Sequence, residues 1–355
     1  MIRFECDYAD GVHPRILERL VQTNEEQTPG YGADMHCERA AGYIRKCCGK
    51  EDAAIHFLVG GTQANLTVIG ALLKPYQGVI SSEWGHIEEH ETGAIEATGH
   101  KVLILPGTDG KISAAQVEDL CRDHAHDENH EHRVQPGMVY ISHPTENGTL
   151  YTKRELKEMA RVCRKWGIPL YMDGARLGYG LAVTAAAEER QEDWPSLPDI
   201  ADLCDLFYIG GTKVGAMFGE ALVITNKAYQ EDFRYHIKQR GALLAKGRML
   251  GIQFEVLFED GLYVETASHA VAMADLIRQA CVQRGYSFLY ETVANQIFPI
   301  FPERVIRELQ RNYVFFVRTR TGEVKGEPHA AVRICTSWAT TEANARQLAA
   351  DILST

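Results

Sequence analysis

The 355-residue sequence contains no hydrophobic run that approaches the ~18 apolar residues of a membrane-spanning helix. Its first residues, Met-Ile-Arg-Phe-Glu-Cys-Asp, lack the apolar core of a secretory signal peptide. The nine cysteines are scattered and include no Cys-x-x-Cys pair, a pattern typical of free thiols in a reducing compartment. We therefore expect a cytoplasmic protein without a membrane partner.

Positive charge is also scarce. The 37 lysines and arginines are outnumbered by 48 aspartates and glutamates, which gives a formal net charge of −11. With no basic stripe, the sequence argues against a nucleic-acid partner. It contains no internal repeat and no low-complexity segment. Hydrophobic residues make up 45% and charged residues 24%, as in ordinary globular enzymes, and the length allows more than one domain.

Short apolar segments alternate with helical ones over the first two thirds of the chain. The strands expected are 53–59, 78–81, 101–105, 138–142, 168–172, 205–209 and 221–225. The helices expected are 14–22, 35–48, one ending at 73, 88–98, 113–123 and 152–166, with a long helical region over 227–260 and short strands such as 296–301 and 331–336 beyond it. Right-handed crossovers of this kind build a mainly parallel sheet.

A glycine turn follows the first strand. Gly60, Gly61 and Thr62 come directly before an apolar helix. Free backbone N–H groups at such a helix N-terminus attract phosphate. No Walker lysine follows the glycines, and a tight turn with Thr62 as the N-cap is an alternative.

Two other strand ends carry charge. The apolar run Leu170 to Met172 stops at Asp173, and Arg176 follows on a new turn. Lys213 stands in a glycine-rich turn after the strand at 205–209. Taken singly, these residues can be a structural acid with its arginine and a solvated turn lysine. Together they indicate one site at one edge of the sheet.

A lysine amine of this kind can form a Schiff base with a carbonyl cofactor. Combined with a phosphate-binding turn and a strand-end aspartate, it suggests pyridoxal 5′-phosphate. The phosphate would lie at residues 60–62. Asp173 would pair with the pyridine nitrogen and keep it protonated, so that the ring accepts electrons from the substrate.

A series of motifs over residues 5–336 occurs in the order of a known family. The motifs are Asp7-Tyr8, Gly11-Val12-His13-Pro14, Gly30-Tyr31-Gly32-Ala33-Asp34, Gly60-Gly61-Thr62-Gln63-Ala64-Asn65, His86, Pro144-Thr145-Glu146-Asn147-Gly148-Thr149, Met172-Asp173-Gly174-Ala175-Arg176, Gly211-Thr212-Lys213 and Arg333. The sequence resembles the L-threonine aldolase and β-eliminating lyase family of fold-type-I pyridoxal-phosphate enzymes, and within it the low-specificity and phenylserine-type aldolases.

The resemblance implies an α/β fold with a large cofactor-binding domain at 1–245, including the N-terminal segment, and a smaller α+β domain at 246–355. The large domain would hold a mainly parallel, seven-stranded sheet. The implied reaction is retro-aldol cleavage of L-β-hydroxy-α-amino acids to glycine and an aldehyde, in a homo-oligomer (dimer or tetramer) with shared sites. β-Elimination or racemisation on the same cofactor is the alternative.

The resemblance also assigns roles to residues. Lys213, His86 and Asp173 would be catalytic. Arg176, Arg333, Cys6, Asp7 and Tyr31 would bind the substrate. Cofactor contacts would come from Gly61, Thr62, His86, Asp173, Arg176, Thr212, Lys213, Arg240 and Lys246, the last two through phosphate and across a subunit boundary. The sequence departs from the family at Thr212, Gly60 and Cys6, each of which replaces a common serine; Cys6 bears on how the substrate carboxylate is held.

Two histidine patterns support other hypotheses. The segment His86-Ile-Glu-Glu-His90 fits an inverted zinc-protease motif, in which His86, Glu89 and His90 would serve a metal hydrolase. It explains none of the other motifs. The histidines at 124–132 lie in an expected surface loop, where His126 is a second candidate base. A non-catalytic binding protein of the same fold is a further alternative, although Lys213, Asp173 and His86 are all present.

Overall fold

The computed structural model describes residues 1–187, 193–324 and 326–355. Its centre is a seven-stranded sheet of order β2-β8-β7-β6-β5-β3-β4. The strands are β2 (Ala54–Leu58), β3 (Gln77–Ser82), β4 (Val102–Leu105), β5 (Gln135–Ser142), β6 (Leu170–Asp173), β7 (Leu206–Gly210) and β8 (Glu220–Ile224). Only β8 runs against its neighbours within this sheet; the other four pairs are parallel. The predicted mainly parallel sheet is therefore confirmed.

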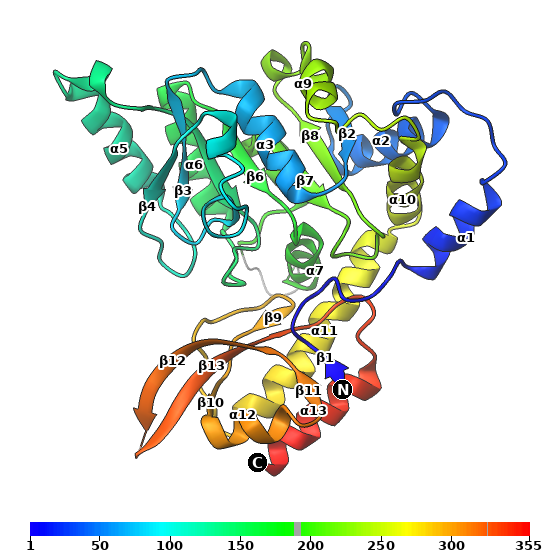
Figure 1. The fold of residues 1–355 in the computed structure, drawn as a ribbon, viewed down its shortest axis with the longest axis vertical. Helices are drawn as coiled ribbons and strands as arrows, with labels where there is room; N and C mark the ends of the chain where they lie inside the picture. The colour runs from blue at the N-terminus through cyan, green and yellow to red at the C-terminus, as the bar shows by residue number, and fades with distance from the viewer. Residues whose placement is uncertain (188–192, 325) are drawn as a thin grey trace.

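Helices cover both faces of this sheet, because successive strand residues point into different cores. Phe207 and Ile209 face one core, while Leu206 and Tyr208 face the other. The first core is covered by α2 (Met35–Cys48), α5 (Ala114–His126), α6 (Lys153–Trp166), α7 (Leu177–Ala187), α8 (Leu197–Leu203) and α10 (Arg248–Glu259). The second is covered by α3 (Gly61–Leu72) and α9 (Phe233–Gln239). The result is a three-layer arrangement (Figure 1).

A second group of elements lies in the lower half of Figure 1, around its own hydrophobic core. It comprises α11 (Leu262–Gln283), β9 (Gln296–Ile297), β10 (Ile300–Pro302), α12 (Glu303–Leu309), β11 (Tyr313–Val314), β12 (Phe316–Val324), β13 (Glu327–Cys335) and α13 (Glu342–Ser354). Strand β1 (Ile2–Arg3) pairs with β11, and Phe4 lies in the same core. The first residues, expected with the large domain, thus pack with the C-terminal strands. The boundary at residue 245 stays a prediction.

The predicted helix at 88–98 is wrong. The chain forms a short helix α4 (His86–Glu89) and a 3₁₀ turn η1 (Glu96–Thr98). Between them, Thr92 and Gly93 take left-handed backbone angles, with φ of 54° and 71°. A helix cannot pass through such residues, so the chain turns back after α4.

The bounds predicted for other helices agree better with the structure. Helix α1 (Pro14–Gln22) and helix α2 have the predicted bounds, and α2 ends at Gly49 with φ 65°. For helix α6, the spacing of Thr152 and Glu155 in the sequence predicts a capping box, and the structure has it. The helical region 227–260 is divided into η4 (Lys227–Tyr229), α9 and α10, and α5 extends to His126 before η2 (His130–His132). For residues 185–203 the sequence predicts a loop with one short helix; helix α8 lies in this segment, part of which is outside the described residues.

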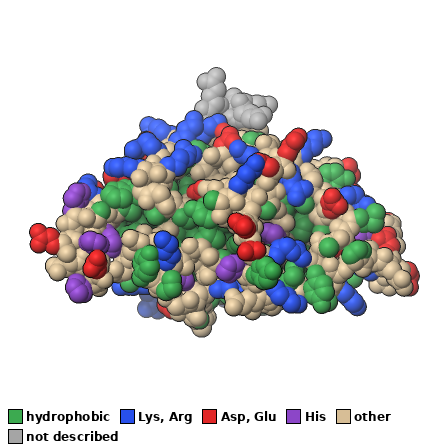
Figure 2. All heavy atoms as spheres, turned by 90° about the horizontal axis from the view of Figure 1, so that it is seen from above, with side chains coloured by type: hydrophobic (Ala, Val, Ile, Leu, Met, Phe, Trp, Pro, Cys, Tyr) green, Lys and Arg blue, Asp and Glu red, His purple; other side chains and the backbone are tan. Residues whose placement is uncertain are grey.

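The described helices include none that is both long and apolar enough to cross a bilayer. On the face shown in Figure 2, acidic and basic side chains are interspersed, so neither sign covers that face. All nine cysteines are free thiols.

Candidate active site

A cavity of about 560 Å³ lies where strands β6 and β7 end. This volume is within the range of small-molecule sites, roughly 300–1,000 Å³. Its lining includes seven of the residues predicted from sequence: Gly61, Thr62, His86, Arg176, Thr212, Lys213 and Arg333. Asp173 touches Tyr208, which also lines the cavity. The fold therefore brings together most of the predicted site.

Asp173 is buried at the end of β6 and has several hydrogen-bond donors around it. Its carboxylate accepts hydrogen bonds from Tyr140 Oη at 2.6 Å, from the Ala175 amide at 3.0 Å, from Asn65 Nδ2 at 3.2 Å and from Tyr208 Oη. Burial alone would raise the pKa of Asp173. The positive charge of His86 and the tyrosine hydrogen bonds outweigh burial and lower that pKa. The site thus holds an ionised carboxylate at neutral pH.

Close backbone approach explains the glycines beside Asp173. A Cβ at Gly174 would lie 1.9 Å from the Tyr208 carbonyl oxygen, and one at Gly210 would lie 2.3 Å from that of Ala175. No side chain fits at either position. The ends of β6 and β7 can therefore lie against each other, and this contact brings Tyr208 to Asp173.

The glycine turn at 60–62 leaves a helix N-terminus open to the cavity. Gly60 is the N-cap of α3, and it provides no side-chain hydrogen bond to the first turn. The alternative in which Thr62 is the N-cap is therefore wrong. Both Gly61 and Thr62 line the cavity, so amides of the first turn are available to an anion there.

Lys213 enters the cavity from the turn between β7 and β8. Its Nζ lies 5.9 Å from the centre of the Tyr8 ring, and it forms no ion pair with any described residue. Behind it, the Glu220 carboxyl group accepts hydrogen bonds from Thr212 Oγ1 at 3.0 Å and the Gly211 amide at 3.1 Å. Burial raises the pKa of Glu220 to about 8, although the charge of Lys213 and the Thr212 hydrogen bond act in the opposite direction. The amine of Lys213 is therefore not held by a carboxylate of the described residues.

Arg176 is held by Asp7 rather than free in the cavity. Its Nε and Nη2 donate to the two Asp7 oxygens at 2.7 and 3.1 Å, and Nη1 lies 3.4 Å from Glu146 Oε2. Asp7 is completely buried and does not line the cavity. The expectation that Asp7 contacts the substrate is therefore not met, because its carboxylate already accepts hydrogen bonds from Arg176 and from Asn295 Nδ2.

This pair predicts acid sensitivity. Burial alone would raise the pKa of Asp7, but Arg176 and Lys213 lower it to about 2. Since the unfolded value is about 3.9, the resulting stability, roughly 2 kcal/mol, is present above pH 4 and lost as the pH falls toward 2. We expect urea unfolding at pH 5, 4 and 3 to show a steeper loss for the wild type than for Asp7→Asn. Asp260→Asn, at an exposed position, should match the wild type. Equal slopes in wild type and Asp7→Asn would contradict the prediction.

Arg333 is the second guanidinium of the cavity. Nη2 donates to the Glu5 carbonyl at 3.0 Å, and the group lies 5.3 Å from the centre of the Phe316 ring. It pairs with no described carboxylate, and its buried Nε has no hydrogen-bond partner among the described residues. Cys6 does not line the cavity but lies two residues before Tyr8, which does; burial raises the pKa of its thiol.

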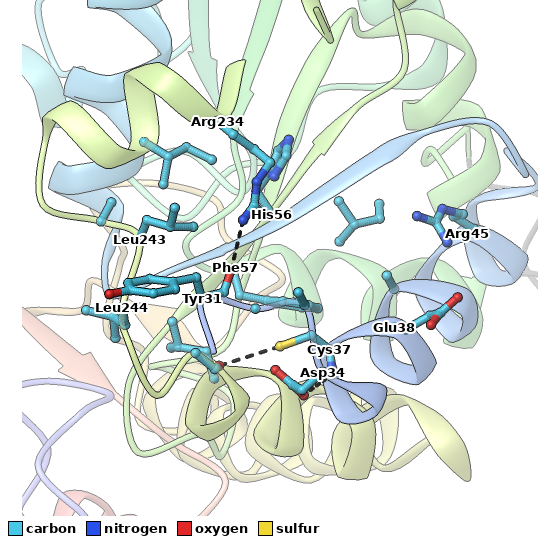
Figure 3. Close-up of a pocket in the computed structure, with 18 residues that line it drawn as sticks. Tyr31, Asp34, Cys37, Glu38, Arg45, His56, Phe57, Arg234, Leu243 and Leu244 are labelled. Atoms are coloured by element: carbon cyan, nitrogen blue, oxygen red, sulfur yellow. Dashed lines mark hydrogen bonds between the residues drawn. The ribbon is translucent and has the colours of Figure 1, made fainter. Parts of the chain in front are cut away.

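Three predicted residues lie elsewhere in the chain. Tyr31 lines a second pocket that shares no lining residue with the cavity, and its carbonyl accepts from Arg234 Nη2 at 3.0 Å (Figure 3). Arg240 packs on Gly70, nine residues along α3 from Gly61, or about 13 Å at 1.5 Å per residue. Lys246 is exposed and does not line the cavity. Within one chain, none of the three can take the role expected for it.

The zinc-hydrolase hypothesis gains no geometric support. His86 Nδ1 lies 2.8 Å from Glu91 Oε1, while Glu89 lies 3.5 Å from His90 Nε2. Among residues 1–187, 193–324 and 326–355, no three side chains of His, Cys, Asp or Glu are arranged to hold a metal ion. His126 is exposed on α5, where Nδ1 lies 2.9 Å from the Arg122 carbonyl oxygen, and it is not part of the cavity.

Sequence reasoning missed several site residues. They are Tyr8, Asn65, Glu91, Tyr140, Tyr208 and Glu220. Tyr8 and Asn65 stand inside recognised motifs, which was the available signal. Tyr140 and Tyr208 lie within apolar strand runs and resemble core residues. Only the fold shows that their hydroxyl groups meet Asp173.

Comparison with known proteins agrees with this site. A family model described as β-eliminating lyase matches residues 10–347. The low-specificity L-threonine aldolase of a Pseudomonas species is 32% identical over 99% of this chain and 96% of its own, and that of Pseudomonas aeruginosa is 31% identical over the same shares. Among solved structures, Leishmania major threonine aldolase has a TM-score of 0.92 and 41% identity over 99% of this chain and 98% of its own.

More distant structures share the fold alone. Thermus thermophilus aspartate aminotransferase has a TM-score of 0.67 and 15% identity over 100% of this chain and 91% of its own. Such enzymes have the fold-type-I arrangement that the sequence predicted. With the family model, the full-length relatives and the geometry of the cavity in agreement, the chain belongs to the L-threonine aldolase and β-eliminating lyase family of pyridoxal-phosphate-dependent lyases.

Proposed function

We propose that this protein cleaves L-β-hydroxy-α-amino acids of the threonine, allo-threonine and phenylserine type to glycine and an aldehyde. The observation that carries the proposal is the convergence of Lys213, His86 and Arg333 on one cavity, with Asp173 beneath it. Amine, imidazole and guanidinium are the groups that such a cleavage requires. The alternative is a β-elimination or racemisation of a small amino acid at the same site.

The residues present fit pyridoxal 5′-phosphate. The open N-terminus of α3 suits its phosphate, the uncommitted amine of Lys213 suits its carbonyl carbon, and the ionised carboxylate of Asp173 suits its ring nitrogen. When bound, this cofactor withdraws electrons from Cα of an attached amino acid. The Thr212 hydroxyl is shared with Glu220, so Gly61 and Thr62 are the better phosphate ligands.

Arg333 is the better candidate for the substrate carboxylate. The charge of Arg176 is already offset by Asp7 and Glu146, whereas Arg333 has an unpartnered Nε among the described residues. A charge-assisted contact to Arg333 would fix the amino acid in one orientation. Orientation of this kind can lower a barrier by roughly 7–11 kcal/mol.

His86 is the candidate base for the substrate hydroxyl. Its Nδ1 contacts Glu91, so in the neutral ring Nε2 is the nitrogen left to accept a proton from the cavity that His86 lines. Help from a positioned base contributes about 10²–10⁴-fold. Departure of that proton as the Cα–Cβ bond breaks releases the aldehyde, and protonation at Cα then gives glycine.

A substrate panel tests the proposal. L-Threonine, L-allo-threonine, L-phenylserine, their D forms and L-serine are supplied to the protein with pyridoxal phosphate, and aldehyde, glycine and pyruvate are measured separately. We expect equal amounts of aldehyde and glycine from the L-β-hydroxy acids and none from the D forms. Pyruvate without glycine would reject the aldolase in favour of an eliminating lyase, and a D-amino acid as product would favour a racemase.

We further propose a homo-oligomer, a dimer or tetramer with shared sites, in the cytoplasm. The position of Tyr31, Arg240 and Lys246 outside the chain's own cavity is consistent with sites completed by another copy. Exposed apolar side chains, such as Leu17 and Val21 on α1 and Met217, supply surface for association. The nine free thiols fit a reducing compartment.

A further inference from the structure

A buried carboxylate that the sequence did not single out lies beside His86. Glu91 is 5% exposed, and its Oε1 lies 2.8 Å from His86 Nδ1. Asn65 Nδ2 donates to the same oxygen at 2.7 Å. Its other oxygen, Oε2, is buried without a hydrogen-bond partner among the described residues. An incompletely paired buried carboxylate is costly, and such a group calls for an explanation.

The chain turns on both sides of Glu91. Helix α4 ends at Glu89, and Thr92 then adopts φ 54°, followed by Gly93 at φ 71°. Thr92 is β-branched, so its left-handed conformation is strained. The chain leaves helical geometry at His90 (φ −128°, ψ 11°), between His86 and Glu91, and the Glu91 carboxylate lies against His86, five residues earlier.

Asn65 fixes Glu91 relative to Asp173. Its Nδ2 also donates to Asp173 Oδ2 at 3.2 Å, so one amide bridges two carboxylates. Tyr171 Oη donates to Asn65 Oδ1 at 2.9 Å, which sets the amide orientation with the NH₂ group toward the acids. Glu91 is thereby held against His86, while Asp173 accepts hydrogen bonds from Tyr140 and Tyr208.

We propose that Glu91 is a positioning residue, which holds the His86 ring in one orientation and keeps the proton on Nδ1, so that Nε2 is the nitrogen presented to the substrate. Carboxylates that accept from one imidazole nitrogen fix the tautomer and the basicity of the other. The proposal deepens the proposed aldolase function and rests on it for the role of Nε2. The state of the His86 ring itself does not depend on the reaction.

The influence of Glu91 on the pKa of His86 is measurable because several charged groups surround the ring. Burial lowers the pKa of His86, but the Glu91 hydrogen bond, with Asp173 and Glu146, raises it above the usual value overall. The His90 ring lies 5.5 Å from the His86 ring, centre to centre. Removal of the Glu91 charge alone should therefore lower the pKa of His86, while Asp173 and Glu146 stay in place.

The test compares Glu91→Gln with Glu91→Asp, which restores the charge, and with Glu88→Gln, the same change at an exposed position of α4. Long-range proton–nitrogen spectra of histidine-labelled full-length protein report the tautomer and pKa of His86 with and without pyridoxal phosphate. The His86 signals are assigned with the variant His86→Gln.

We expect the Nδ1–H tautomer and a raised pKa of His86 in wild type and Glu88→Gln. In Glu91→Gln the pKa falls, the acidic limb of the kcat/KM–pH profile moves to lower pH, and kcat drops about 10–100-fold, as for other residues that orient an imidazole. Glu91→Asp should restore most of the His86 pKa, of the position of the acidic limb and of kcat.

An unchanged His86 pKa and pH profile in Glu91→Gln would overturn the proposal. If that variant does not fold, Glu91→Ala takes its place, since it also removes the carboxylate from His86 Nδ1; an unchanged His86 spectrum there would overturn the proposal in the same way. If the spectra change as expected but the wild type cleaves no β-hydroxy amino acid, the proposed function fails and the positioning of the ring by Glu91 stands.

Discussion

Replacement of Lys213 by alanine should lower turnover of L-threonine or L-phenylserine by about 10³-fold or more, which corresponds to at least roughly 4 kcal/mol of transition-state stabilisation. Lys213 is the only lysine that lines the described cavity, and its amine has no ion-pair partner among the described residues. No neighbouring amine can therefore replace it as the covalent attachment point of the cofactor. The measurement is steady-state kcat with saturating pyridoxal phosphate, together with the visible absorbance of the protein.

A matched change isolates the effect. Lys227→Ala removes an exposed lysine whose Nζ lies 2.8 Å from Asp52 Oδ2, and it should leave turnover and colour unchanged. Borohydride reduction of the wild type, followed by proteolysis and mass spectrometry, should find the reduced cofactor on the peptide that contains Lys213. Full activity of Lys213→Ala in ordinary buffer would refute the assignment of the site.

Much of the sheet could be predicted because local signals and the final fold agree. The β5–α6–β6 unit shows this: Thr152 caps its helix, and the apolar run before Asp173 marks its strand. Lys213 and Asp173 could be placed at one site because carboxyl ends of parallel strands meet at one edge of a sheet. In such segments, the tertiary structure adds little to what periodicity and capping already specify.

Other features depend on contacts that are distant in the sequence. Tyr140 and Tyr208 look like core residues in their strands, and only the sheet order places both hydroxyl groups on Asp173. Strand β1 finds its partner β11 more than 300 residues later, so no local pattern could assign it to the C-terminal core. Single-sequence patterns carry no information about such pairings.

The error at 88–98 has a different origin. Glutamate and alanine, which favour helices, make up six of the eleven residues there, and Gly93 is the signal against a helix. The structure shows that Thr92 adopts the left-handed conformation first. A β-branched residue rarely adopts that conformation, so the turn after α4 could not be predicted from propensity. The positions of Arg240 and Lys246 are a separate case, because their expected roles involved a second subunit.

The second large effect is expected for Asp173→Asn. This change keeps the shape of the side chain but removes the charge that Tyr140, Tyr208 and the Ala175 amide stabilise. We expect kcat to fall by about 10²–10³-fold, the size seen when one oriented electrostatic contact is lost from an active site. The pKa of Asp173 is lowered by His86 and its hydrogen bonds despite burial, whereas burial raises the pKa of Glu220 to about 8.

Stability separates this charge effect from damage to the fold. The amide introduced at position 173 can still accept one tyrosine hydrogen bond but not both, so the free energy of unfolding should fall by about 1–3 kcal/mol. Asp202→Asn, an exposed change whose carboxylate lies near Lys50, should alter neither kcat nor stability. Denaturant unfolding and kcat are measured on the same preparations saturated with pyridoxal phosphate. If Asp173→Asn lost the expected stability yet kept its kcat, the carboxylate would be a structural strand-end acid. The activity would then have to depend on Lys213 and His86 without a charge beneath the cavity.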